Sequence, residues 1–394
     1  MSSYFYSRFF KYLRIIFQFN TKGNDYKEWE IMPLILSVGK AVPKYKIDQE
    51  NIVPFIRELF LKRYPSIDRL LSVFQNGEIQ SRYISKELSW YSEEHSFEQK
   101  NQAYTEISIE LSIEAIKNCL TSNEFLSSEI QYEKIDGIIF VSSTGISTPT
   151  IDAHIANILP FNSSIKRIPI WGLGCAGGAS GISRAFDYCK AHPKSNILLV
   201  AVELCSLTFQ KEDLSKSNII GTSLFADGAA AVLVIGDESE LKNRTIHKSL
   251  PSIEQTNSTL MPNSLDVMGW DVRNDGLFVI FSRDIPSIVK NWLQPVVSNF
   301  LTQYELTIRD ITHFIAHPGG KKVLDAYIDS LDLSEANIEI SLNILKSYGN
   351  MSSCTVLFVL SEYMKLGKTN EHGLLCALGP GFSSELSLLK WVEC

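Results

Sequence analysis

A single cysteine lies where the backbone is least hindered, in the segment WGLGCAGGASG, residues 171–181. Cys175 sits among five glycines, after a hydrophobic run and before a helix-like run. At a helix N-terminus, free backbone N–H groups and the helix dipole stabilise a thiolate, and a nearby imidazolium lowers its pKa further. The glycines before Cys175 permit a tight turn, and those at 177 and 178 leave room for a bulky thioester. The pattern favours an acyl-accepting nucleophile over an inert buried thiol.

Two further side chains could act, together with Cys175, on the carbonyl group of a thioester substrate. His317 follows the apolar segment HFIA and precedes PGG, and Asn350 follows Gly349 at the start of a helix-like run. Taken alone, His317 is read as an ordinary loop histidine and Asn350 as a helix N-cap. Together with Cys175 they form a set in which each member follows a strand-like segment. Open parallel sheets place their chemistry at such strand ends.

The segments around these residues alternate between strand-like and helix-like patterns. Helical spacing of apolar residues marks 51–73, 105–120 and 176–191. Strands are expected in PLILSVGKAVP (33–43), IDGIIFVSSTG (135–145), RIPIWGLG (167–174), NILLVAVEL (196–204) and FADGAAAVLVIG (225–236). Strands that alternate with helices of this length indicate an α/β protein with a mainly parallel sheet covered on both faces.

The order of elements recurs in the second half of the chain. Residues 343–364 read as strand, glycine, one polar residue and helix, as the segment around Cys175 does. Cys175 and Asn350 therefore take equivalent places. The pattern predicts an N-terminal extension followed by two duplicated βαβαβ halves, which comprise residues 1–31, 32–245 and 246–394. Duplicated α/β halves bind substrate where their strand ends meet.

Size, charge and cysteine content narrow the class of protein. The chain has 394 residues, 45% of them hydrophobic, and a net charge of −7. That charge argues against broad nucleic-acid binding, which needs a basic surface. Seven cysteines with no C-x-x-C spacing argue against a zinc site and a disulfide framework, and favour the reducing cytoplasm. No apolar run reaches the roughly 20 residues that a membrane span needs.

The N-terminal segment SYFYSRFFKYLRIIFQF is both aromatic and basic, with polar and apolar residues on separate helical stripes. It lacks a small-residue cleavage site, and basic residues interrupt its apolar part, so it is not read as a signal peptide. Residues 4–19 could make a peripheral contact with an anionic membrane, or pack on the body or on a second subunit. Residues 21–31 are polar and are read as a linker.

Five ordered motifs give the chain a resemblance to a known family. GLGCAGGASG, LFADGAAA, IAHPGGKKVLDA, YGNMSS and LGPGF resemble, in order and spacing, motifs of the type III polyketide synthases, the chalcone- and stilbene-synthase-like condensing enzymes. The resemblance covers residues 32–394. It implies the thiolase fold, an α/β fold with duplicated halves in α-β-α-β-α layers. It also implies a homodimer that uses malonyl-CoA and acyl-CoA, with no metal and no other cofactor.

By this resemblance, Cys175, His317 and Asn350 are a catalytic triad. The Cys175 thiolate would attack a starter acyl-CoA and become an acyl-enzyme. Malonyl-CoA would then lose CO2, and His317 and Asn350 would stabilise the resulting enolate by hydrogen bonds. The backbone N–H of Cys175 would serve the other carbonyl. Neutral imidazole and amide groups suit this role, because a carboxylate would repel the enolate.

The resemblance also assigns a substrate pocket. Phe225, in LFADG, matches a gatekeeper aromatic. Val279 stands where a second gatekeeper phenylalanine is usual and should widen the entrance. Trp270 stands where a small residue is common, and it either shortens the elongation cavity or is only a core residue. The other positions assigned to substrate are Thr208, Cys205, Ser352 and Gly319.

The CoA site is weakly marked. The family binds CoA phosphates through basic side chains on an early helix, and the candidates here are Arg57, Lys62, Arg63 and Arg69. Their spacing does not match the family pattern cleanly, and Lys62 is the one we choose. Glu203, which follows a buried strand, matches a family position whose role is structural rather than catalytic.

These features predict an iterative enzyme that extends a flexible aliphatic acyl-CoA. The expected product is a pyrone or a compound of the resorcinol or phloroglucinol type. One alternative is a ketoacyl synthase III-like enzyme that performs a single condensation, or an acyltransferase. The other is a non-catalytic lipid-binding protein of the same fold.

Overall fold

The computed structural model describes residues 32–61, 67–282 and 284–394. Residues 32–394 form one compact unit. The predictions for residues 1–31, including the membrane contact of 4–19, lie outside the described residues. Among the described residues, no helix combines the length and apolar character that crossing a membrane requires.

Nine strands form the framework, as two groups that meet at one residue pair. The first group runs in the order β5 (Lys166–Ile170), β4 (Gly137–Val141), β6 (Asn196–Leu204), β7 (Asp227–Ile235) and β1 (Leu34–Ala41). The second runs β8 (Ser249–Leu260), β13 (Ser383–Glu393), β12 (His372–Gly379) and β11 (Ile311–Ala316). The groups join where Leu34 of β1 pairs with Ser252 of β8. We call them the first and second sheets.

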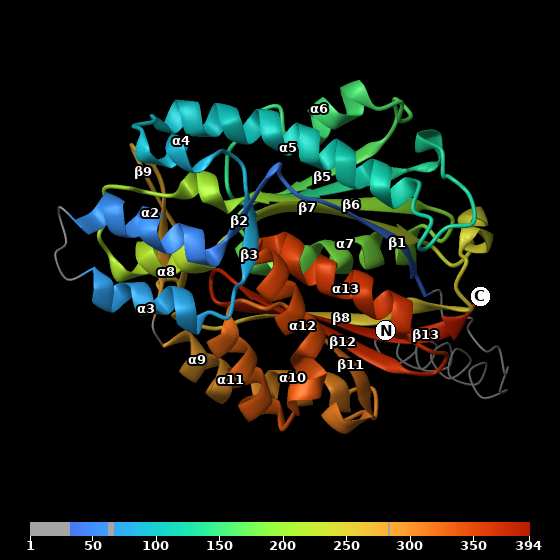
Figure 1. The fold of residues 1–394 in the computed structure, drawn as a ribbon. Coiled ribbons are helices and arrows are strands. Elements are labelled where there is room, and N and C mark those ends of the chain that lie inside the picture. Colours follow the sequence, from blue (N-terminus) through green and yellow to red (C-terminus); the bar gives the residue numbers. More distant parts are fainter. Residues whose placement is uncertain (1–31, 62–66, 283) are drawn as a thin grey trace, which may run out of the picture. The chain divides into compact units, whose positions relative to one another are not determined.

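Helices cover both faces of each sheet, giving five layers (Figure 1). Helices α5 (Phe97–Leu120) and α6 (Ile151–Ile158) cover the outer face of the first sheet, and α7 (Gly177–Ala191) and α13 (Thr355–Leu366) lie between the sheets. The outer face of the second sheet is covered by α10 (Gln294–Thr302), α11 (Lys321–Leu331) and α12 (Glu335–Tyr348). The predicted layered α/β arrangement is confirmed.

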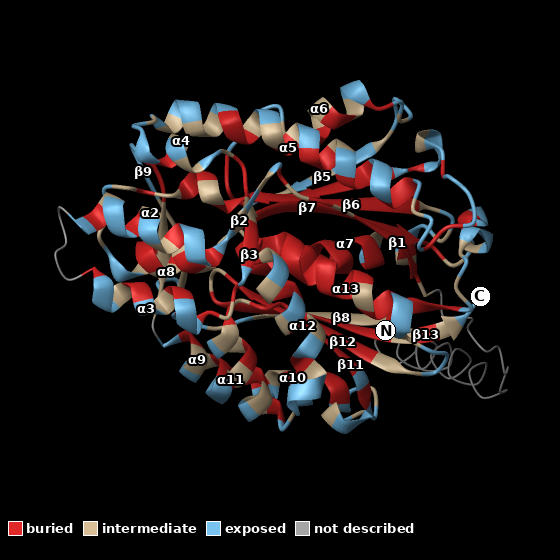
Figure 2. Ribbon diagram, viewed as in Figure 1, coloured by how far each residue is buried: buried red, intermediate tan, exposed pale blue. Residues whose placement is uncertain are grey.

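Burial explains why the central strands need cover on both sides. All nine residues of β6 and all nine of β7 are buried. Figure 2 shows these strands and most of α7 and α13 as buried. Strands that are apolar on both faces remove this surface from water only when a helix layer lies on each side.

The two sheets repeat one topology. The pairs β1–β7 and β7–β6 are antiparallel and β6–β4 is parallel; β8–β13, β13–β12 and β12–β11 repeat these directions in the same order. The duplication therefore extends to strand direction. The expectation of a mainly parallel sheet is wrong, because five of the eight strand pairings are antiparallel. The short turn between β12 and β13 shows why: only antiparallel strands can be joined so tightly.

One predicted strand is a helix instead. Residues 343–348, expected to mirror β5, form the last turns of α12, so among the described residues β5 has no counterpart in the second sheet. A capping box at Ser334 starts α12, and its buried positions Ile338, Ser341 and Leu345 recur at helical spacing. The short apolar run before Gly349 is the end of this helical stripe.

A smaller layer lies beside the two sheets. It contains α2 (Gln49–Leu61), α3 (Asp68–Asn76), α8 (Lys216–Leu224) and the antiparallel strand pair of β2 (Tyr45–Asp48) and β3 (Ser81–Ile84). The helices share an apolar core of Ile52, Ile56, Phe60, Ile67, Leu71, Phe74 and Ile219. The single helix expected over 51–73 is therefore two helices, α2 and α3. A β-hairpin, β9 (Met268–Arg273) with β10 (Gly276–Phe281), contacts α8.

Candidate active site

The three residues singled out from the sequence meet in one cavity. Cys175, His317 and Asn350 all line a space of about 390 Å³, which we call the Cys175 cavity. Cys175 lies in a single 3-10 turn, Gly174–Ala176, just before α7. His317 directly follows β11, and Asn350 follows α12 and the glycine that caps it. Asn350 therefore reaches the cavity from a helix end rather than from a strand end.

The glycines around Cys175 shape the backbone more than they admit a substrate. Gly172 and Gly174 have φ angles of +91° and +46°, the left-handed region that glycine adopts at little cost. A Cβ at Gly177 would lie 2.6 Å from Val141, and one at Gly178 would lie 2.2 Å from the carbonyl oxygen of Ser353. The expectation that 177 and 178 leave room for a thioester is therefore wrong, because both face neighbouring protein.

The thiol and the imidazole are both buried. Cys175 is 6% exposed and His317 is 2% exposed. Burial raises the pKa of the Cys175 thiol to about 11, with hydrogen bonding to Ser352 and Asn350 opposing the shift. Burial lowers the pKa of His317 to about 3, so an imidazolium beside the thiol, as expected from the sequence, is not favoured in the unliganded site. Proton transfer from thiol to imidazole would still leave this pair of side chains with no net charge.

The backbone holds His317 while its ring remains available. The His317 N–H donates to the Cys376 carbonyl at 2.8 Å, and the Gly319 N–H donates to the His317 carbonyl at 3.0 Å. Within the described part of the chain, neither ring nitrogen has a hydrogen-bond partner. A buried ring with both nitrogens unpaired costs free energy that a bound ligand or water can recover. The ring is therefore free to contact a ligand in the cavity.

Asn350 is oriented by four hydrogen bonds. Its backbone N–H donates to the Leu224 carbonyl and its carbonyl accepts from the Ala226 N–H, both at 2.9 Å. Its side-chain Oδ1 accepts from the Ser352 N–H at 2.8 Å, and Nδ2 donates to the Gly319 carbonyl at 3.2 Å. One Nδ2 hydrogen suffices for Gly319, so the second can donate to a ligand.

Glu203 connects the elements that surround Cys175. Its carboxylate accepts from the Ser143 N–H at 3.0 Å, the Thr144 hydroxyl at 2.9 Å and the Ser353 hydroxyl at 2.7 Å. These donors belong to the segment after β4 and to the turn before α13. Burial raises the pKa of Glu203 to about 7, against the effect of its hydrogen bonds. The contacts agree with a structural role for this residue.

The Glu203 pKa predicts a pH dependence of stability. In the unfolded chain a glutamate loses its proton near pH 4.5, whereas folded Glu203 keeps it to about pH 7. The folded state then binds the extra proton, so this residue makes the free energy of unfolding fall as the pH rises through that window. We expect Glu203→Gln to remove this contribution to the pH dependence of the free energy of unfolding, which is at most about 1.4 kcal/mol per pH unit. Denaturant unfolding across the window measures it.

The control for this prediction is Glu114→Gln, which changes an exposed glutamate of α5. Its unfolding curve should follow that of the wild type at every pH. Parallel curves for Glu203→Gln and the wild type would contradict the assignment of the raised pKa to Glu203.

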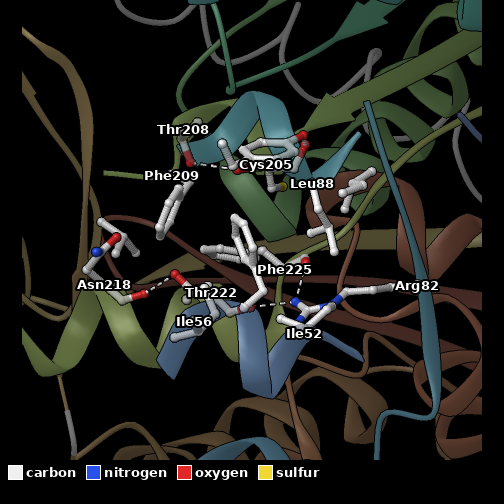
Figure 3. A pocket seen from close by; sticks show the side chains of 16 residues that line it. Ile52, Ile56, Arg82, Leu88, Cys205, Thr208, Phe209, Asn218, Thr222 and Phe225 are labelled. Carbon is white, nitrogen blue, oxygen red and sulfur yellow. Dashed lines mark hydrogen bonds between the residues drawn. The ribbon is translucent and has the colours of Figure 1, made fainter. Parts of the chain in front are cut away.

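The residues expected to bind substrate are divided between two places. Phe225, Thr208, Cys205 and Val279 line a second cavity of about 70 Å³, which we call the Phe225 cavity (Figure 3). Gly319 lines the Cys175 cavity. Ser352 follows Asn350 by two residues, is 5% exposed, and lowers the pKa of the Cys175 thiol.

Trp270 acts on the Phe225 cavity through an aromatic neighbour. The Phe225 ring lies 5.8 Å from Trp270 and 5.5 Å from Phe281, centroid to centroid. Trp270 and Val279 are cross-strand partners in the β9–β10 hairpin. Trp270 is not among the described residues that line either cavity. Trp270 therefore packs against the Phe225 ring and is not part of the wall of either cavity.

The basic residues near the Cys175 cavity are mostly ones that the sequence analysis did not select. Lys62 lies outside the described residues. Arg57 forms an exposed ion pair with Asp68 at 2.8 Å and does not line the cavity. The described cations that line it are Arg69, Lys216, Lys321 and Lys322. The only sequence signal for the last two is that they directly follow the HPGG motif.

Tyr327 is another residue of the cavity that the sequence did not reveal. It belongs to α11, is fully buried, and packs edge to face against Phe314. In the residues that the structure describes, its hydroxyl has no hydrogen-bond partner. Burial raises the pKa of Tyr327 well above its usual value, so the hydroxyl remains a neutral donor.

Comparison with known proteins adds independent evidence. Models of the N-terminal and C-terminal domains of chalcone and stilbene synthases match residues 28–238 and 252–393. A putative chalcone synthase of Bacillus subtilis is 51% identical over 362 residues, 91% of this chain and 99% of that protein. A 1,3,6,8-tetrahydroxynaphthalene synthase of Streptomyces peucetius is 33% identical over 361 residues, 91% of this chain and 93% of that protein.

The same likeness holds for solved structures. The crystal structure of 1,3,6,8-tetrahydroxynaphthalene synthase from Streptomyces coelicolor, described as a bacterial type III polyketide synthase, has a TM-score of 0.83. It is 28% identical and covers 92% of this chain and 100% of that one. A polyketide synthase structure from the brown alga Ectocarpus siliculosus has a TM-score of 0.81 at 24% identity, which supports the fold alone.

Proposed function

This chain belongs to the chalcone and stilbene synthase family of type III polyketide synthases, and we propose that it extends an aliphatic acyl-CoA starter by iterative condensation with malonyl-CoA. It has the thiolase fold of that family and is an acyltransferase. The proposed product is a pyrone or a ring of the resorcinol or phloroglucinol type. Cys175, His317 and Asn350 are the proposed catalytic residues.

The first step loads the starter. The Cys175 thiol passes its proton to the His317 imidazole while sulfur attacks the acyl carbonyl carbon. The carbon–sulfur bond to CoA breaks, and CoA leaves as a thiol with the proton that His317 held. Two buried neutral groups suit this exchange, because the charge separation exists only while the thioester is attacked.

The second step extends the chain. Malonyl-CoA loses CO2, and the electron pair of the broken bond forms an enolate on the remaining acetyl-CoA. A His317 N–H and the second Nδ2 hydrogen of Asn350 donate to the enolate oxygen as charge develops there. The enolate carbon attacks the acyl-enzyme, and the Cys175 thiolate leaves and takes up a proton. The chain returns to CoA two carbons longer, and no metal or redox cofactor is needed.

The Phe225 cavity is the observation that favours an aliphatic starter. Its lining is mostly apolar: Ile52 and Ile56 come from α2, Ile84 comes from β3, and Leu88 and Phe209 come from segments further along the chain. An alkyl chain gains free energy on entering such a space, about 0.8 kcal/mol for each buried methylene. The basic residues Arg69, Lys216, Lys321 and Lys322 in the Cys175 cavity would bind the CoA phosphates.

We expect a homodimer formed through β5. This strand ends the first sheet, and its first two residues are exposed. Exposed apolar side chains lie near it, with Trp171 at 53% and Ile158 at 59% exposure. An uncovered sheet edge beside exposed apolar groups is typical of an interface.

A panel of acyl-CoA starters tests the proposed function. The enzyme is incubated with malonyl-CoA and acyl-CoAs of short, medium and long chain length, and with an aromatic acyl-CoA, and products are identified by mass. Aliphatic lactones or rings carrying several malonyl-derived units are expected. Trp270→Gly should shift the product sizes, because it removes the aromatic contact behind Phe225. Single-extension products, or activity confined to the aromatic starter, would contradict the proposal.

A further inference from the structure

Arg82, at the wall of the Phe225 cavity, is a buried cation. It lies in β3, is 2% exposed, and lines the Phe225 cavity. A buried guanidinium is stable only if its donors are used, because its charge has lost the hydration of water. Its hydrogen bonds therefore show what it does for the fold.

The partners of Arg82 are backbone carbonyls at the end of α8. Nη1 donates to the Thr222 carbonyl at 2.6 Å and to the Phe225 carbonyl at 2.7 Å (Figure 3). Nη2 donates to Gln49 Oε1 at 2.8 Å, and Gln49 Nε2 donates to the Ser223 carbonyl at 3.1 Å. The carbonyls at a helix C-terminus lack partners within the helix and carry partial negative charge. Arg82 and Gln49 satisfy three of them, and we call the pair the clamp.

A conventional ion pair does not explain Arg82. The buried acid whose charge acts on Arg82, Asp227, accepts hydrogen bonds from the Ser85 hydroxyl at 2.5 Å and the Ser206 N–H at 2.7 Å, and another from the Ser206 hydroxyl. Its oxygens are therefore satisfied by neutral donors. Asp227 stabilises the Arg82 charge only at a distance. Nη1 of Arg82 donates to the carbonyls and Nη2 to Gln49, while Nε has no partner among the described residues.

The other side of the same segment is held by Asn350. Leu224 and Ala226 flank Phe225, and their backbone groups pair with those of Asn350 at 2.9 Å. The backbone of Phe225 thus lies between the clamp and a residue of the Cys175 cavity. Its ring lines the Phe225 cavity, while its neighbour Leu224 lines the Cys175 cavity.

We propose that Arg82, with Gln49, is a positioning residue that sets chain-length specificity by fixing the backbone of Phe225 between the two cavities. The inference rests on the proposed function. Without the clamp, the partly buried carbonyls of Thr222 and Phe225 lose a charged donor beside a mostly apolar cavity, so the segment shifts to find new donors. The Phe225 ring then moves with it, and the Phe225 cavity admits longer chains.

Arg82→Gln tests the proposal in the full-length enzyme. The measured quantity is the ratio of turnover with a long-chain acyl-CoA to turnover with a short-chain one, and we expect about a tenfold rise in favour of the long chain, in keeping with the loss of hydrogen bonds to a charged donor. A general loss of folded enzyme cannot change this ratio. Arg82→Lys keeps the charge but not the fork of donors, so its turnover ratio should lie between those of Arg82→Gln and the wild type. The rate of Cys175 alkylation by iodoacetamide should not change.

The matched control is Arg184→Gln, an exposed arginine of α7 paired with Asp187, which should leave the ratio unchanged. If Arg82→Gln does not fold, Gln49→Ala removes the other half of the clamp and should move the ratio in the same direction. An equal loss of activity at all chain lengths would overturn the inference while leaving the proposed function intact. Failure of the wild type to extend any aliphatic starter would instead reject the proposed function.

Discussion

Cys175→Ala is expected to abolish polyketide formation, with a fall in rate of roughly four orders of magnitude or more, as when an enzyme loses a covalent nucleophile. Alanine has no sulfur to accept the starter, so the acyl-enzyme cannot form. Product analysis by mass spectrometry measures the first effect. The mass of the intact protein after incubation with acyl-CoA measures the second.

The same variant should still release CO2 from malonyl-CoA. Decarboxylation uses the donors on His317 and Asn350, and neither is changed. The control is Cys189→Ala, which makes the same substitution in α7, where the thiol contacts the Ser195 carbonyl away from both cavities. This control should retain activity. Polyketide formed by Cys175→Ala would disprove the assignment of the nucleophile.

His317→Ala should slow malonyl-CoA decarboxylation by roughly 10²- to 10³-fold, the range found when one donor to a developing oxyanion is removed. The cleanest measurement uses the Cys175→Ala background, where release of CO2 is separated from loading and condensation. Because burial holds the pKa of His317 near 3, the ring stays neutral at ordinary pH. His317 should therefore contribute no step to the pH profile of decarboxylation between about pH 5 and 8.

His313→Ala is the matched control for this second prediction. His313 lies in β11, four residues before His317, and its Nε2 contacts Glu371 at 2.8 Å, outside both cavities. The decarboxylation rate should be close to that of the parent. A His317→Ala enzyme that decarboxylates at the parental rate would show that the ring does not contact the thioester.

The sequence predicted the meeting of distant residues better than it predicted their local structure. His317 was placed correctly at the end of β11, because a short apolar strand and a following glycine motif are local signals. Asn350 reaches the expected cavity, but from the end of α12. Six apolar and polar residues before Gly349 fit a strand and a helix turn equally well, and only the capping box at Ser334 distinguishes them.

The direction of the strands could not be read from hydrophobic runs. Such runs report that β6 and β7 are buried on both faces, which is true of parallel and antiparallel strands alike. The glycines at 177 and 178 are a second feature whose structural reason could not be predicted from the sequence. A glycine signals a close approach but not what approaches, and here it is Val141 and Ser353.

The pocket residues were foreseen as a group, but their division between two cavities was not. That division depends on the Phe225 ring and on its neighbours Trp270 and Phe281, which come from a hairpin far along the chain. Arg82 and Tyr327 carry no motif at all. Their importance comes from hydrogen bonds made or missing across the fold, and no spacing in the sequence encodes these.

Helix α7, which begins beside the nucleophile, contacts strands of both sheets. Each half of the duplicated chain therefore contributes one interior helix, α7 or α13, that packs against the strands of both halves. A half produced alone would expose to water the face of α7 or α13 that now lies against the missing strands. A half produced alone would therefore need another protein surface, such as a second copy of itself, to cover that face.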